Sequence, residues 1–273
     1  MSVKLSMKFK SACIVGSVAL GLLSGCSSTP DKKEEKAKAV ETTEAEPKTS
    51  AQELFIQGNK KLDEKDFPAA IALYDKALER DDQRWDIYMN KAIAHSAKQQ
   101  FSEAIAAMDR ALATGGDKEA QVYFNLGNIY QNRGLYAQSI KAYKTSLAVG
   151  DGQSIDTLVN LGGALALMRE YDKAVETYNH IRSLAPDDPR PYVGMGVVEQ
   201  ARDNNKLAVE FYEQAQQIDP DFEQAWYNHA AVLADMKRYS DAAQSYRRYL
   251  ELAPDGPYAK RARASLRRLK SKN

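Results

Sequence analysis

The chain has very few of the residues that form disulfides or metal sites. Its 273 residues include two cysteines and three histidines. Cys13 lies in an apolar stretch near the start, so removal of that stretch would leave Cys26 without an internal disulfide partner. No Cys, His and Asp residues cluster at the spacing of metal ligands, and we expect no metal and no other cofactor.

An excess of charge of one sign is also missing. With 38 basic and 37 acidic residues, the body of the chain has no basic stripe, and nucleic acid is not an expected partner. The chain also lacks a phosphate-binding Gly-rich loop, a His-Glu-x-x-His pair and a Gly-x-Ser-x-Gly elbow. The three histidines fall at packing positions of the pattern described below, so we expect no enzyme: His95, His180 and His229.

No apolar run is long enough to span a membrane comfortably. The apolar stretch 12–23 follows three lysines and leads into Leu23-Ser24-Gly25-Cys26, which predicts a secretory signal over residues 1–25, with Met7 an equally suitable start. The ending resembles the bacterial lipobox, in which a peptidase cuts before the cysteine. The resemblance implies that Cys26 carries the lipid, and the alternative is a plain secreted protein with a cysteine near its cleavage site.

The residues after Cys26 indicate in which membrane the protein is anchored and how the anchor is joined to the rest of the chain. By analogy with proteobacterial sorting, Ser27 in place of Asp favours an outer-membrane lipid anchor facing the periplasm over the inner membrane. Segment 26–50 is rich in Lys, Glu, Thr and Ala and nearly free of large apolar residues, so we expect a disordered linker.

Six stretches of about 34 residues then repeat one pattern. A small residue is followed, twelve positions later, by a second small residue and, four positions after that, by a large one, as in Gly127, Ser139 and Tyr143. A turn former such as Pro186 or Pro220 comes near each repeat's end. Small side chains let two antiparallel helices approach closely, and the large one fills the gap beside them. We place the repeats at 51–84, 85–119, 120–154, 155–188, 189–222 and 223–256.

This pattern resembles the tetratricopeptide repeat. The fourth repeat carries the signature as Leu158, Leu161, Gly162, Leu165, Ala174, Tyr178, Ile181 and Pro186, whereas the first two repeats have Gln57 and Lys91 where Leu is usual. The resemblance implies an all-α fold, a right-handed α-solenoid of six helix-turn-helix repeats, with about thirteen helices counting a C-terminal capping helix.

The family resemblance also implies a ligand site on the concave surface lined by the first helix of each repeat. One position facing it holds an apolar row: Phe55, Met89, Phe124, Val159, Val193 and Tyr227. The next position holds Asn90, Asn125, Asn160 and Asn228, interrupted by Ile56 and Gly194, with Asn59 and Asn128 one helical turn beyond. A carboxamide donates and accepts, so these side chains suit a peptide backbone along repeats two to four. The alternative is that some of these asparagines bond the backbone of their own hairpin.

A free carboxylate is a poor ligand for this surface. Relatives that grip an acidic chain terminus place Lys and Arg at groove positions that here hold Phe55, Asn59, Asn90, Gln121 and Asn125. Arg190 is the one clear cation that we place in the row, and it would also be satisfied by facing solvent.

Residues 257–273 hold seven cations and no acid. Ala259, Ala262, Leu266 and Leu269 recur at helical spacing, which predicts a basic helix that covers the last repeat. An anionic lipid or partner contacting Arg263, Arg267 and Lys270 is the alternative use of this helix.

These features together predict a membrane-anchored periplasmic scaffold that binds proteins or peptide segments of the cell envelope. The chain looks like the pilotins that escort secretin subunits of pili, which favours a role in assembling a pilus or secretion apparatus. It looks equally like adaptors that regulate peptidoglycan hydrolases or proteases. A homodimer formed through Phe55 and Ile56 remains open.

Overall fold

A computed structural model describes residues 49–270, which form thirteen α-helices, one short 3-10 helix and no strand. Successive helices pair as antiparallel hairpins, and the last helix packs on the sixth hairpin. The bounds are α1 Ala51–Asp63, α2 Phe67–Leu78, α3 Trp85–Ala97, α4 Phe101–Ala113, η1 Gly116–Lys118, α5 Ala120–Arg133, α6 Tyr136–Val149, α7 Ile155–Leu167, α8 Tyr171–Leu184, α9 Arg190–Ala201, α10 Asn205–Ile218, α11 Glu223–Asp235, α12 Tyr239–Leu252 and α13 Ala259–Lys270. The predicted all-α solenoid of six helix pairs with a capping helix is confirmed.

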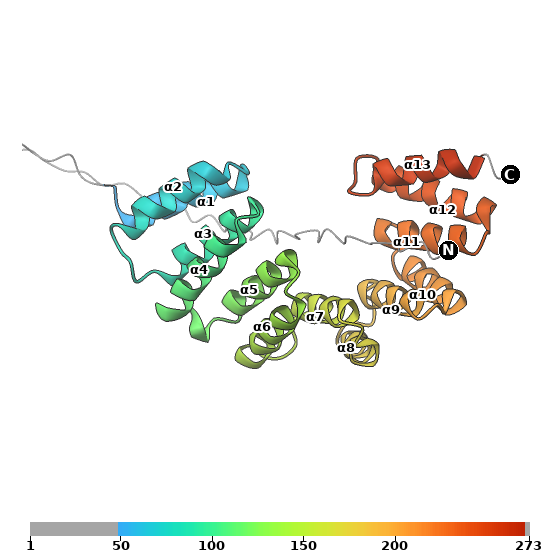
Figure 1. The fold of residues 1–273 in the computed structure, drawn as a ribbon, viewed down its shortest axis with the longest axis horizontal. Coiled ribbons are helices and arrows are strands. Elements are labelled where there is room, and N and C mark those ends of the chain that lie inside the picture. The colour runs from blue at the N-terminus through green and yellow to red at the C-terminus, as the bar shows by residue number, and fades with distance from the viewer. Residues whose placement is uncertain (1–48, 271–273) are drawn as a thin grey trace, which may run out of the picture.

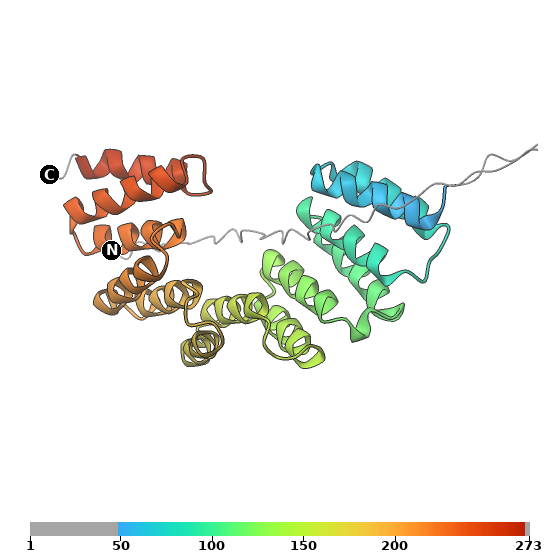
Figure 2. The same ribbon diagram turned by 180° about the vertical axis from the view of Figure 1, so that it is seen from behind.

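The pairs stack into an open arc, with α1 at one end and α13 at the other (Figure 1). The first helix of each pair lies toward the inside of the arc, and the view from behind shows the same order (Figure 2). First helices of neighbouring pairs contact one another more than second helices do, as expected on the shorter, inner side of a curved stack. The inner face is therefore built from α1, α3, α5, α7, α9 and α11.

Side-chain caps fix where several helices begin. Ser50 accepts a hydrogen bond from the backbone N–H of Glu53, and the Glu53 carboxylate accepts one from Ser50 in return. Asp66 caps α2 and Ser154 caps α7 in the same way, each accepting from the N–H three residues on. These oxygens satisfy backbone donors that the first helical turn leaves without partners.

Within each hairpin, a large side chain of the second helix fits against a small residue of the first. Tyr143 has no exposed surface, and a Cβ added at Gly127 would lie 2.4 Å from its ring. Gly58 with Tyr74, Gly162 with Tyr178 and Gly196 with Tyr212 repeat this contact. Close helix approach in the hairpins therefore depends on these small residues, as the sequence predicted.

The turn between the two helices of each pair uses one conformation six times. Its central residue has a positive φ of 61° to 84° in every repeat, at Lys65, Gln99, Gly134, Arg169, Asp203 and Lys237. Only one of the six is a glycine, although side chains disfavour this left-handed region. Packing of the two helices therefore outweighs the local backbone preference at five of the turns.

Replacing Gly127 by Ala is expected to destabilise the protein by about 1–3 kcal/mol, because the new methyl group overpacks the buried Tyr143 ring. The matched control is Gly163→Ala on α7, where an added Cβ has no neighbour within 4 Å. That change is expected to stabilise by about 1 kcal/mol through helix propensity. Urea unfolding of both variants measures the difference, and a Gly127→Ala variant as stable as Gly163→Ala would contradict the packing described.

The basic C-terminal segment forms α13, which covers the end of the array. Ala259, Ala262 and Leu269 are buried in the same cluster as Tyr246 and Tyr249 of α12. The predicted capping role is confirmed by this burial.

The predicted signal, Cys26 and the linker up to residue 48 lie outside the described residues. No helix among residues 49–270 combines the length and apolar character needed to cross a membrane.

Candidate functional site

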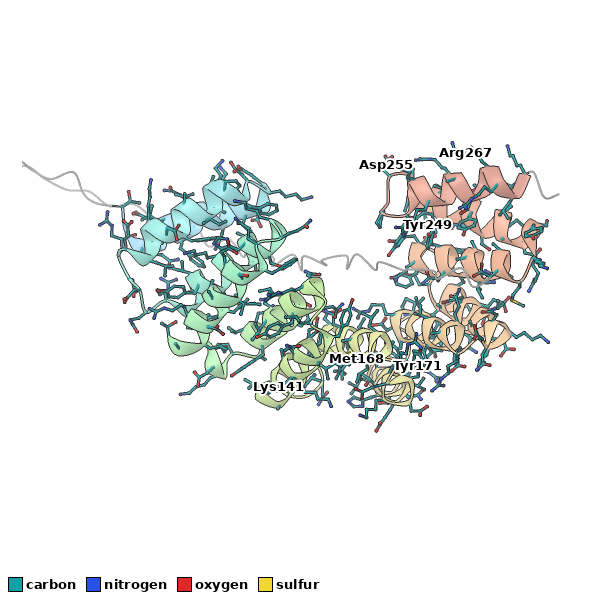
Figure 3. All side chains as sticks on the ribbon, viewed as in Figure 1. Lys141, Met168, Tyr171, Tyr249, Asp255 and Arg267 are labelled. Carbon is teal, nitrogen blue, oxygen red and sulfur yellow. The ribbon has the colours of Figure 1, made fainter. Side chains whose placement is uncertain are left out.

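The candidate site is the inner face of the arc, and every predicted groove residue lies on a first helix. Phe55 is on α1, Met89 and Asn90 on α3, Phe124, Asn125 and Asn128 on α5, Val159 and Asn160 on α7, Val193 on α9, and Tyr227 and Asn228 on α11. Lys141 of α6, on a second helix, lies on the opposite, outer side (Figure 3).

The apolar row packs partly into the core. Phe55 lies 6.1 Å from the ring of Tyr74, and Phe124 lies at the same distance from Tyr143. Both stay partly exposed, as do Met89 and Val159. Val193 is a correction: it is 4% exposed, because it packs in the cluster that joins the last two repeats, so it offers no surface to a ligand.

Tyr227 ends the apolar row at the C-terminal side of the arc. It stacks 4.4 Å from Tyr258, just before α13, and meets Tyr246 and Tyr249 edge-on. The rings of Tyr227 and Tyr258 therefore help attach the capping helix to the sixth repeat.

Asparagines join neighbouring repeats through what we call amide bridges. The side-chain oxygen of Asn59 accepts from the Tyr74 hydroxyl and from Asn90 Nδ2 of the next repeat, each at 2.8 Å. In the second bridge, Asn128 Oδ1 accepts from the Tyr143 hydroxyl at 2.7 Å and from Asn160 Nδ2 at 3.1 Å. The expectation that some asparagines bond backbone within their own hairpin is wrong for these, because their partners are side chains. Sequence reasoning assigned these tyrosines to packing and missed the hydrogen bonds of their hydroxyls, although the tyrosines recur 15 residues after Asn59 and Asn128.

The other two asparagines of the predicted row lie outside these bridges. The preceding repeats have Ile93 and Val197 at the position that Asn59 and Asn128 occupy. As a result, Asn228 Nδ2 is buried without a partner among the described residues. Asn125 is partly exposed, and no described residue hydrogen-bonds its side chain. Its carboxamide is therefore available to a ligand.

A cavity of about 140 Å³ lies next to Phe124. The end of α6, the turn after it and the start of α7 complete the lining, which includes Gln121 and Asp156. Phe124 lines this cavity, and the unengaged carboxamide of Asn125 follows it on α5, so the two residues can take a side chain and a backbone group of a partner together.

Arg190, the cation that the sequence placed in the groove row, is engaged inside the protein. Arg190 donates to both carboxylate oxygens of Asp188, and it donates to Oδ1 of Asp156 in the previous repeat at 2.6 Å. The alternative that Arg190 simply faces solvent is wrong, because these two carboxylates hold its guanidinium.

On the capping helix, Arg263, Arg267 and Lys270 are exposed, and Arg263 also donates to the Pro254 carbonyl. Arg267 lies on the side of α13 away from α12 (Figure 3). These three side chains form one face at the end of the array, apart from the inner face.

The histidines differ from one another. His229 is 8% exposed and its Nδ1 lies 3.2 Å from Ser245 Oγ, while the partly buried His95 pairs with Gln100. His180 is exposed, so a packing position was the wrong prediction for it, because it faces outward near the end of α8. Among residues 49–270, no three His, Cys, Asp or Glu side chains gather closely enough to hold a metal ion.

Comparison with known families agrees with the repeat geometry. Profiles described as tetratricopeptide repeat match residues 61–123, 118–187 and 200–266, which cover well over half of the chain. The chain belongs to the tetratricopeptide repeat family. Tetratricopeptide repeat domains bind proteins or peptides, a use that suits the inner face.

Relatives of this tetratricopeptide repeat protein are distant. The human protein O-mannosyl-transferase TMTC1 is 33% identical over 106 residues, 37% of this chain and 12% of its own length. The chain thus spans about an eighth of that relative.

Many solved structures share the fold of this tetratricopeptide repeat protein, and two of them illustrate the similarity. A tetratricopeptide repeat protein from Parabacteroides merdae gives a TM-score of 0.63 at 16% identity, covering 81% of this chain and 92% of its own. PilF of Pseudomonas aeruginosa gives a TM-score of 0.60 at 16% identity, and the alignment covers 82% of this chain and 97% of PilF.

Proposed function

We propose that this tetratricopeptide repeat protein is a non-catalytic, membrane-anchored scaffold that binds an extended segment of a partner protein across its inner face. The observation that carries the proposal is the pair Phe124 and Asn125. One is an apolar ring beside a cavity, and the other is a carboxamide with no hydrogen bond from a described residue. The segment lies along repeats two to four, with Phe124 taking a side chain and Asn125 a peptide group.

The amide bridges assign complementary roles to the neighbouring asparagines. Asn90 and Asn160 each donate through Nδ2 to the previous repeat. Their side-chain oxygens are left to accept from backbone N–H groups of the partner. Because Arg190 is neutralised by Asp188 and Asp156, the face suits an internal segment better than a free carboxylate.

Location and pathway rest on the sequence. Cys26 is the proposed lipid anchor, and Ser27 favours the periplasmic face of an outer membrane. A pilus or secretion apparatus is the proposed assembly, on the resemblance to pilotins. The likeness to PilF supports the fold on which such a role would be built.

The proposal predicts that Phe124→Ala with Asn125→Ala in the full chain abolishes capture of the partner. The matched control is Phe55→Ala with Ile56→Ala on α1, the same two positions in the first repeat, which alters the same face outside repeats two to four and should reduce capture far less. Circular dichroism verifies that both variants keep their helices. Unchanged capture by the Phe124 and Asn125 variant would reject the inner face as the binding site.

A further inference from the structure

The contact between repeats four and five lacks the polar groups present at comparable contacts. Gly163 of α7 stands where Asn59 and Asn128 stand in their repeats. Gly194 of α9 stands where Asn90 and Asn160 donate across the contact. Both carboxamides of an amide bridge are therefore missing here, while its tyrosine, Tyr178 of α8, is present.

The Tyr178 hydroxyl has no partner among the described residues. Tyr74 and Tyr143 donate to asparagines, and Tyr212 donates to Gln200 at 3.3 Å. Ala166 replaces that glutamine in the fourth repeat. Tyr178 is only 4% exposed, but its hydroxyl oxygen is not fully enclosed by the described residues. The oxygen therefore reaches the surface.

The ring of Tyr178 points at Gly194. A Cβ added to Gly194 would lie 2.3 Å from Tyr178 Cζ, the atom that carries the hydroxyl. A Cβ added to Gly163 would meet nothing within 4 Å. We call the space in front of Gly163, ending at Gly194 and the Tyr178 hydroxyl, the Tyr178 notch.

We propose that the Tyr178 notch binds the side-chain carboxamide of an asparagine or glutamine from the partner polypeptide. The carboxamide oxygen accepts the hydrogen bond of Tyr178, as Asn128 accepts that of Tyr143. The inference rests on the proposed function, since it assigns one residue type of the segment bound across the inner face and extends that segment from repeat four to its contact with repeat five. At the two amide bridges the protein supplies the carboxamide oxygen that accepts from the tyrosine. At the Tyr178 notch the partner supplies it.

Charge and protonation favour a neutral acceptor. Burial raises the pKa of Tyr178, and no charged group of the described chain contributes to the shift, so the hydroxyl remains a donor. A carboxylate in the notch would lose its hydration and would find no positively charged partner there. Its desolvation free energy is therefore larger than that of a neutral carboxamide. An aliphatic side chain would leave the hydroxyl unpaired.

The test uses a phage-displayed library of random 12-residue peptides selected on the immobilised full chain. Twelve extended residues reach about 40 Å, enough to cover Asn125 and the notch together. We expect the selected peptides to share one asparagine or glutamine. Replacing it by leucine should weaken binding about tenfold, and so should Tyr178→Phe. Combining the two changes should cost no more than either alone, because both remove one hydrogen bond.

Two further variants separate binding from folding. Gly163→Asn supplies the missing carboxamide from the protein itself, so it should raise the melting temperature while weakening the peptide about tenfold. Tyr143→Phe is the matched control, because its hydroxyl is already paired with Asn128, and it should change peptide affinity by less than about twofold.

The outcomes distinguish this inference from the proposed function. Peptides that depend on Phe124 and Asn125 but ignore both Tyr178→Phe and Gly163→Asn would overturn the notch and leave the inner face as the binding site. Peptides weakened by Gly163→Asn without a shared asparagine or glutamine would overturn the carboxamide assignment. No selected peptides, or peptides indifferent to all these variants, would overturn both.

Discussion

Replacing Tyr143 by Ala is expected to lower the free energy of unfolding by about 4 kcal/mol, because the buried ring fills the contact between two hairpins. The side chain has no exposed surface and lies in the cluster shared by repeats three to five. Its removal leaves a cavity at that contact, and a repeat array relies on each neighbour contact for its stability. Urea unfolding followed by circular dichroism measures the loss.

The variant Tyr143→Phe separates packing from hydrogen bonding. It keeps the ring and removes only the hydroxyl that bonds Asn128 and Gln131, so we expect a loss of about 1 kcal/mol. If Tyr143→Ala cost no more than Tyr143→Phe, the ring would not be the element that holds the two hairpins together.

Acid is expected to destabilise the chain through His229. Burial, with a smaller effect of Arg238, lowers the pKa of His229 from 6.5 to about 4 in the folded protein. Glu213 lies 3.7 Å from Nε2, and Asp241 opposes the shift, but burial dominates. Between pH 6.5 and 4, His229 is therefore protonated in the unfolded chain and neutral in the folded chain. The free energy of unfolding falls as the pH falls through this window.

The size of the effect follows from the shift. Lowering the pKa of His229 from 6.5 to about 4 corresponds to a loss of about 3 kcal/mol in the free energy of unfolding by pH 4. Above pH 6.5 the histidine makes no such contribution. The control is His229→Leu. It introduces leucine, the usual residue at this position of the repeat, and removes the titrating group. Between pH 6.5 and 4, the unfolding free energy of the parent should fall by about 3 kcal/mol more than that of the variant. Parallel curves would contradict a neutral, buried His229.

The repeat period made most of the fold predictable. Gly127 and Tyr143 illustrate why: a small and a large residue at fixed spacing, repeated six times, specify how two helices pack without information from elsewhere. The left-handed turns at Lys65 and Gln99 were not predicted, because neither residue favours that conformation.

The site was less predictable, because each side chain's role depends on the neighbouring repeat. Asn90 and Asn125 look alike in the sequence, yet Asn90 is bonded to Asn59 and Asn125 has only Ile93 at the matching position. Tyr178 looks like Tyr143, but Gly163 and Gly194 stand where the two asparagines of an amide bridge would be, so its hydroxyl has no partner among the described residues. Such differences appear only when side chains of consecutive repeats are placed together.

The measurement that tests the central claim most directly is photo-crosslinking from position 124. A crosslinking residue replaces Phe124 in the full-length protein in its own cell, and mass spectrometry identifies what it captures. We expect capture of one partner protein, which is lost when Asn125 and Asn160 are replaced by Ala. No capture at position 124, with capture from Arg267 on α13 instead, would contradict binding across the inner face and move the binding site to the basic cap.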